Sequence, residues 1–271
     1  MQSIGTCFGS AAVVLLLVMA AGIPSAAPQE SAPAQVAGTE QGKPSGKVPD
    51  DEWKSFYAVY DKRSELAKHK EALGLLVDLA TRYPEDKRVQ VLCSMTAYSY
   101  AHRLDDKGRM AAARQGIPCA ERILKTDKKD YEGRFWHAMT TFKAKSAEGI
   151  RSALKESTRV KKYLEDMIKD EPNRFEAYML LGSLYRELPP VLTWGDPKKG
   201  LEILEKGTAL KPDDPEILLE LAAAYAKVGE KAKAKATYLR CINDSKSPKD
   251  RTWETEDARE YARKMMKELG E

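Results

Sequence analysis

The hydrophobic pattern repeats most clearly between residues 175 and 246, where apolar and small residues recur at intervals of three and four. In the first copy these are Tyr178, Leu181, Gly182 and Tyr185, and in the second they are Leu218, Leu221, Ala222 and Tyr225. Such spacing places the side chains on one face of an α-helix. After each copy a second pattern follows, and Ala234 and Tyr238 lie 34 residues after Gly200 and Leu204. The chain therefore predicts two consecutive helical hairpins, over 175–212 and 213–246.

These spacings resemble the tetratricopeptide signature, whose repeat is 34 residues long. Between the first helices the period is 40, because Tyr225 lies 40 residues after Tyr185. The six extra residues fall in the segment 188–197, whose three prolines cannot continue a helix. We therefore expect a shaped loop inside the first of these hairpins.

Small residues occupy the positions where the two helices of each hairpin would cross. They are Gly182, Gly200 and Gly207 in the first hairpin, and Ala222, Ala234 and Cys241 in the second. Larger side chains at these places would hold the helices apart. The pattern thus predicts close antiparallel packing.

Weaker copies of the same pattern precede residue 175. Helical pairs are predicted over 50–83, 89–124 and 131–169, and a final apolar stripe that begins near Trp253 predicts a capping helix. The predicted fold is all-α: a right-handed solenoid of five tetratricopeptide-like hairpins with a C-terminal capping helix. First helices should line its concave face.

The N-terminal segment has the composition of an export signal. Residues 11–22 are Ala, Val, Leu, Met and Gly, and Ser25, Ala26 and Ala27 provide small residues near a cleavage point. We expect a secretory signal peptide over 1–27, a flexible linker over 28–50, a folded domain over 51–271, and a periplasmic or secreted location. The alternative is a retained anchor, since 4–23 has the length of a membrane span, and membrane contact is expected only in that case. Cys7 precedes the apolar run, so a lipoprotein acylation site is not predicted.

Charge and motifs favour a non-enzymatic binding protein. The net charge of +4 comes from 45 basic and 41 acidic residues that are interspersed, which does not indicate nucleic-acid binding. The sequence contains no nucleophile elbow and no phosphate-binding or dinucleotide-binding glycine motif. His69, His102 and His137 fall in different predicted hairpins, so neither a metal site nor a cofactor is expected.

Two cysteines fall within one predicted hairpin. Cys93 and Cys119 lie on its two helices, and either a disulfide bond or two buried thiols fits the sequence. Cys241 is expected to be a buried thiol.

Residues of the first helices that do not pack within a hairpin are the candidates for a ligand groove. They are mostly apolar, and with Trp194 of the loop they form this set: Val91, Met95, Tyr98, Trp136, Met179, Ser183, Trp194, Leu219 and Ala223. A groove that clamps a carboxylate would need several converging cations, which this face does not supply. A hydrophobic small molecule or an amphipathic segment of a protein partner is expected instead. Alternatively, Met179, Leu219 and Trp136 pack against neighbouring repeats, and Trp194 fills its own hairpin.

The segments 176–190 and 194–207 are similar to the T component of TRAP transporters, in which a Pro-rich loop ending in Gly-Asp also divides a late repeat. That resemblance implies an exported, non-enzymatic accessory that associates with a substrate-binding protein and holds a hydrophobic ligand. The leading hypothesis is therefore an exported tetratricopeptide-type binding protein with an apolar groove, as an accessory of a periplasmic solute transporter. The alternative is a protein-interaction scaffold for cell-envelope assembly.

Overall fold

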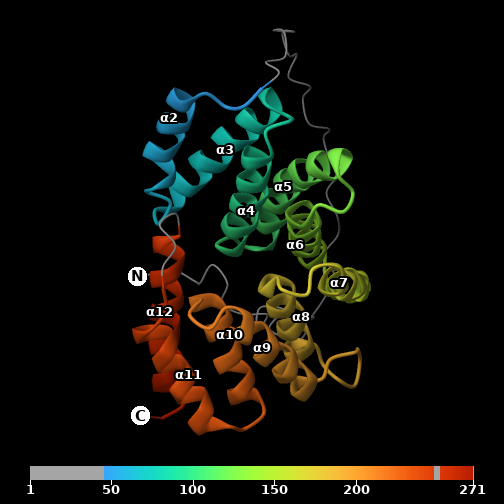
Figure 1. Cartoon of the computed structure of the whole chain (residues 1–271), viewed down its shortest axis with the longest axis vertical. Coiled ribbons are helices and arrows are strands. Elements are labelled where there is room, and N and C mark those ends of the chain that lie inside the picture. Colours follow the sequence, from blue (N-terminus) through green and yellow to red (C-terminus); the bar gives the residue numbers. More distant parts are fainter. Residues whose placement is uncertain (1–45, 247–250, 271) are drawn as a thin grey trace, which may run out of the picture.

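The computed structural model describes residues 46–246 and 251–270, and this part of the chain is entirely α-helical (Figure 1). Ten of its eleven helices form five sequential antiparallel hairpins, and the eleventh packs on the last hairpin. The helices are α2 (Asp50–Tyr60), α3 (Leu66–Arg82), α4 (Lys87–His102), α5 (Asp106–Thr126), α6 (Tyr131–Ala147), α7 (Ile150–Asp170), α8 (Phe175–Glu187), α9 (Pro197–Leu210), α10 (Pro215–Lys227), α11 (Lys231–Asn243) and α12 (Thr252–Glu268). The predicted all-α solenoid of tetratricopeptide-like hairpins is confirmed.

Aspartates begin many of these helices. The carboxylate of the N-cap residue accepts hydrogen bonds from backbone N–H groups of the first turn in α4, α5, α6, α9 and α10, through Asp86, Asp105, Asp130, Asp196 and Asp214. These bonds satisfy donors that have no partner inside the helix. Helix α2 differs, because its N-cap is Pro49, and Asp50 and Asp51 lie in its first turn. Just before α2, Val48 is already buried and donates its N–H to the carboxylate of Asp86 at 2.9 Å.

Glycine sets the close approach of α8 and α9, as the repeat pattern predicted. A Cβ atom on Gly182 would lie 2.6 Å from Cγ of Leu204, and one on Gly200 would lie 2.8 Å from the carbonyl oxygen of Gly182. Both distances are too short for real contacts. The intervening loop, 188–196, joins the two helices where the six extra residues were expected.

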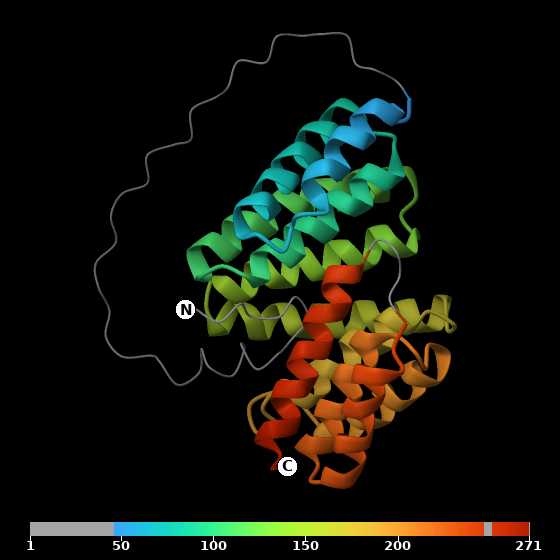
Figure 2. The ribbon, with the colours of Figure 1, turned by 90° about the vertical axis from the view of Figure 1, so that its left-hand side faces the viewer.

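Helix α12 covers the last hairpin and also reaches the first one. Its Ala258 and Ala262 pack in a core cluster with Leu219 of α10 and Tyr238 of α11. At its N-terminal end, Glu254 forms a buried ion pair at 2.6 Å with Arg63, which lies between α2 and α3. Figures 1 and 2 show α12 extending from the C-terminal repeats to the N-terminal ones. The helix therefore caps the array as predicted and, in addition, joins its two ends.

Trp253 completes this junction, which we call the clasp and define by Arg63, His69, Arg103, Trp253 and Glu254. The guanidinium carbons of Arg63 and Arg103 lie 5.9 and 5.1 Å from the centre of the Trp253 ring, and His69 contacts it edge-on at 5.8 Å. Cations over an indole ring are attracted to its face. Residues from the two ends of the array are thus held in one buried contact.

Cys93 and Cys119 form a disulfide bond between α4 and α5, with their Cα atoms 6.2 Å apart. Cys241 is a free thiol and is fully buried. Of the two possibilities that the sequence left open, the structure thus has the bonded pair. None of the helices within 46–246 and 251–270 is both long and apolar enough to cross a membrane. The expected signal peptide, 1–27, lies outside the described residues.

Candidate functional site

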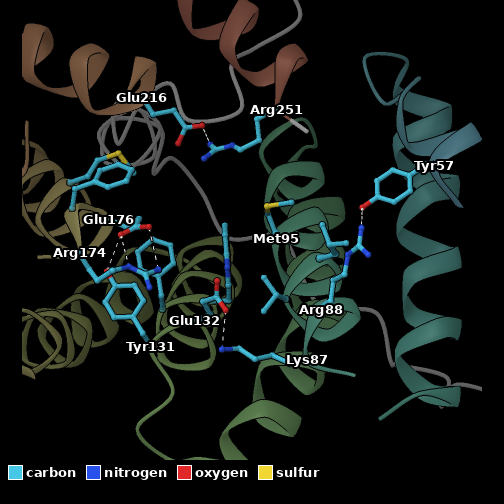
Figure 3. A pocket seen from close by; sticks show the side chains of 16 residues that line it. Tyr57, Lys87, Arg88, Met95, Tyr131, Glu132, Arg174, Glu176, Glu216 and Arg251 are labelled. Carbon is cyan, nitrogen blue, oxygen red and sulfur yellow. Dashed lines mark hydrogen bonds and ion pairs between the residues drawn. The ribbon is translucent and has the colours of Figure 1, made fainter. Parts of the chain in front are cut away.

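A pocket of about 600 Å³ lies on the concave face of the array (Figure 3). It is lined by all five first helices or their N-terminal flanks, together with Arg251 just before α12. The lining residues are Tyr57, Lys87, Arg88, Val91, Leu92, Met95, Tyr131, Glu132, Phe135, Trp136, Arg174, Phe175, Glu176, Met179, Glu216 and Arg251. First helices therefore do line the concave face, and beside its apolar and aromatic side chains the lining carries seven charged residues.

Three glutamates of the pocket occupy the same place in successive repeats. Glu132, Glu176 and Glu216 each lie in the first turn, as the second residue of α6, α8 and α10. A carboxylate there is stabilised by the helix dipole. The repeat thus directs three negative charges toward one pocket, although no sequence motif for a carboxylate site is present.

Each of these glutamates has a basic partner that also lines the pocket. Lys87 lies 3.0 Å from Glu132, Arg174 lies 3.3 Å from Glu176, and Arg251 forms an ion pair with Glu216. Lys87 also lies 2.6 Å from Asp130. Burial opposes ionisation of Asp130, but hydrogen bonds from the N–H of Gly133 and from Lys87 hold the pKa of its carboxyl below the ordinary value.

Arg88 is the remaining cation of the lining, and it has no carboxylate partner among the described residues. Its guanidinium donates a hydrogen bond at 2.9 Å to the hydroxyl of Tyr57 and lies 4.3 Å from the centre of the Trp53 ring. These contacts orient the side chain without neutralising it. An exposed guanidinium, fixed beside aromatic rings, can bind a carboxylate with two parallel hydrogen bonds.

Four of the nine candidates from the sequence line this pocket: Val91, Met95, Trp136 and Met179. Val91 and Met95 lie on the same face of α4 as Arg88, at spacings of three and seven residues. Tyr98, one turn beyond Met95, is buried instead, and its ring contacts those of His102 and Trp136. The pocket thus ends at about the middle of α4.

The other four candidates are withdrawn from the pocket by neighbouring elements. Ser183 is buried and donates a hydrogen bond at 2.6 Å to Glu220 of α10, so it joins two hairpins. Leu219 is buried because α12 covers that face of α10, and Ala223 is half-buried outside the pocket. Trp194 packs edge-on against Tyr185 at 4.7 Å and fills its own hairpin. The sequence left the packing of Leu219 and Trp194 open between the groove and the core, and it did not indicate the contact of Ser183 with Glu220.

The three histidines are separate, as their positions in the sequence suggested. His69 contacts Ser99 and Arg103, His102 contacts Lys143, and His137 lies 4.0 Å from Glu121. Within the described ranges no group of three or more His, Cys, Asp or Glu side chains is placed to hold a metal ion.

The family model of regulator of microtubule dynamics proteins 1–3 matches residues 56–194 of this chain. This segment runs from α2 to the loop after α8 and makes up more than half of the chain. The chain belongs to this family. Four of the five first helices that line the pocket lie within or overlap the matched segment. No curated protein sequence matches the chain.

One solved structure shows the same fold as this family member. The thermophilic tetratricopeptide protein TTC0263 of Thermus thermophilus is 17% identical, with a TM-score of 0.55 over 77% of this chain and 97% of that one. MamA from Desulfovibrio magneticus is 15% identical, with a TM-score of 0.41 over 70% of this chain and 93% of that one. The first likeness confirms the tetratricopeptide-like repeat. The finer resemblance to TRAP transporter components stays a prediction.

Proposed function

We propose that the chain is a protein-interaction module whose pocket binds a peptide segment of a partner through an acidic group placed on Arg88. The observation that carries this proposal is the absence of a carboxylate partner for Arg88 among the described residues, while the other three cations of the pocket are paired. Backbone groups and mixed side chains of a peptide can match a lining that alternates aromatic and charged residues. An entirely apolar ligand would leave the charge of Arg88 without an anionic partner.

A panel of fluorescein-labelled peptides that end in acidic residues, each with a free or an amidated C-terminus, tests this proposal by fluorescence anisotropy. A hydrogen-bonded charge pair contributes about 1.5–3 kcal/mol, so Arg88→Glu should weaken binding by roughly 10- to 100-fold. Arg159→Glu is the matched control, because Arg159 is an exposed arginine of α7 outside the pocket. Peptides that bind Arg88→Glu as tightly as the unaltered chain would contradict the proposal.

We also propose that the protein works outside the cytoplasm. The apolar run at 11–22 and the Cys93–Cys119 disulfide support this location, because disulfides persist in oxidising compartments. There, a substrate-binding protein of a TRAP-type transporter, or another envelope protein, would supply the segment that the pocket binds. Cell fractionation with mass spectrometry of the mature N-terminus tests export, and an intact protein confined to the cytoplasm would refute it.

The family description refers to microtubules, and that statement concerns the proteins that carry the name. What we take from it for this chain is a protein partner, which the repeat fold supports independently. The proposal for Arg88 does not depend on which protein supplies the peptide.

A further inference from the structure

The loop between α8 and α9 exposes two aliphatic side chains at its tip. Val191 is 94% exposed and Leu192 is 67% exposed, whereas Leu239, the next most exposed large hydrophobic residue of the described ranges, is 45% exposed. In Figure 1 this loop projects from the side of the array. Neighbouring exposed aliphatic residues at a protruding tip indicate a surface that becomes buried against something else.

The tip is held in place by a hydrogen-bonded base. The N–H and hydroxyl of Thr193 both donate to the carbonyl of Pro189, at 3.0 and 2.8 Å, and the N–H of Asp196 donates to the carbonyl of Tyr185 at 2.8 Å. Gly195 lies so close to Leu188 that a Cβ atom would overlap its carbonyl group. The fold therefore positions Val191 and Leu192 outward instead of letting them collapse onto the array.

Lysines surround the base of this loop. The ammonium nitrogen of Lys161 lies 5.1 Å from the centre of the Trp194 ring, and that of Lys199 lies 4.7 Å from the Tyr185 ring. Lys198 is exposed at the first turn of α9, and none of the three forms an ion pair within the described residues. The nearby acids include Glu165, whose charge acts on Lys199, and Asp196, whose carboxylate accepts two backbone hydrogen bonds as the N-cap of α9. Glu187, at the end of α8, is paired with Arg186 at 2.7 Å.

We propose that this loop is a membrane-docking tip, whose Val191 and Leu192 insert among the acyl chains of an anionic bilayer while the lysines contact its headgroups. The aliphatic residues of the tip match the apolar interior of a bilayer, and the lysines around its base, which we call the lysine rim (Lys161, Lys198 and Lys199), match the anionic headgroups. Protein interfaces mostly depend on aromatic or arginine anchors, and Leu and Val are under-represented among them. The lysine rim selects an anionic surface, because each lysine near such a surface adds favourable energy.

Co-sedimentation of the full chain with vesicles tests this inference, using phosphatidylcholine with and without phosphatidylserine. Val191→Asp with Leu192→Asp should lower partition onto anionic vesicles by about tenfold or more, and Lys198→Gln with Lys199→Gln by roughly 10- to 30-fold. Leu239→Asp is the matched control, because it removes an exposed aliphatic residue of α11 and should leave partition unchanged. Circular dichroism verifies that each variant is folded.

A second measurement reports the environment of residue 192 directly, so it distinguishes insertion of the tip from membrane binding through the apolar run at 11–22. The unaltered chain has 4 tryptophans, so its emission is subtracted from that of Leu192→Trp. The remaining emission, from the new tryptophan, should shift to the blue on anionic vesicles and be quenched by brominated acyl chains. The proposal is overturned if the chain does not bind anionic vesicles or if this emission is unchanged when it does. A blue shift in buffer without lipid would assign the tip to a protein interface and would also overturn it.

Discussion

Substituting alanine for glycine should have opposite effects at two helical positions of this chain. Gly200, near the start of α9, faces α8, and a Cβ atom there would lie 2.8 Å from both the backbone nitrogen of Arg186 and the carbonyl oxygen of Gly182. Gly74 lies in the interior of α3, and a Cβ atom there would meet nothing within 4 Å. The two substitutions therefore make the same chemical change in a closed and in an open environment.

The magnitudes follow from two competing contributions. Alanine is favoured over glycine in a helix interior by about 0.8–1 kcal/mol. At Gly200, overpacking costs about 1–3 kcal/mol, and we take the upper value because both contacted atoms belong to backbone and cannot rotate away. Gly200→Ala should thus lower the free energy of unfolding by about 2 kcal/mol, and Gly74→Ala should raise it by up to about 1 kcal/mol.

Urea unfolding followed by circular dichroism measures both changes in the full chain. The midpoints should move in opposite directions, while the dependence on urea stays the same, because neither substitution changes the surface exposed on unfolding. If Gly200→Ala is as stable as the unaltered chain, or if both variants move in the same direction, close packing of α8 on α9 is not what glycine provides there.

Three further predictions concern buried groups. Removing one partner of a buried ion pair costs about 3–5 kcal/mol, so Glu254→Gln should lower the free energy of unfolding in urea by that amount. The double variant Arg63→Met with Glu254→Leu, which removes both charges, should recover most of this loss. A loss below about 1 kcal/mol in Glu254→Gln would contradict a buried clasp. Burial, with the charges of Arg103 and Arg63, lowers the pKa of His69 to about 3, so below pH 6.5 the unfolded chain binds a proton that the folded chain does not. As the pH is lowered, this residue should reduce the free energy of unfolding by about 1.4 kcal/mol per pH unit between about pH 5.5 and 4. His69→Gln should reduce that slope, whereas an unaltered slope would refute the assignment. Burial raises the pKa of the Cys241 thiol to about 12, so iodoacetamide at pH 8 should modify Cys241 only when urea unfolds the chain. Peptide mass spectrometry measures this modification. Modification without urea would show that the thiol is accessible in the folded chain.

The hairpins could be predicted from the sequence because their packing depends on local spacing. Leu181, Gly182 and Tyr185 recur in register with Leu221, Ala222 and Tyr225, and the structure pairs helices at those positions. Boundaries were less well defined: α3 begins at Leu66 without a capping signal in the sequence, because the side chain of its N-cap residue, Glu65, makes no capping hydrogen bond.

The clasp could not be predicted, because it joins residues that share no period and lie far apart in sequence. Arg63 and Glu254 are ordinary charged residues in the sequence, and only the curvature of five stacked hairpins brings them within 2.6 Å. The same curvature explains the errors at Leu219 and Ser183, since α12 and the neighbouring hairpin cover the face that a helical wheel leaves open.

The pocket's charges were missed for a different reason. An acidic residue in the first turn of a helix is common, and it normally reflects the helix dipole alone. Glu132, Glu176 and Glu216 acquire a shared environment only because the N-terminal ends of α6, α8 and α10 meet on one side of the array. Arg88 carried a usable signal, because it lies on the same face of α4 as Val91 and Met95.

The clasp and the pocket share one short segment of chain. Arg251 lines the pocket through its ion pair with Glu216, and Trp253 and Glu254, two and three residues later, hold the first hairpins. Because these residues lie within about one helical turn, the first turn of α12 cannot leave Arg63 without also moving Arg251 away from Glu216. A peptide that binds the closed pocket more tightly than the open one must therefore stabilise the clasp as well, by an amount set by its affinity and concentration.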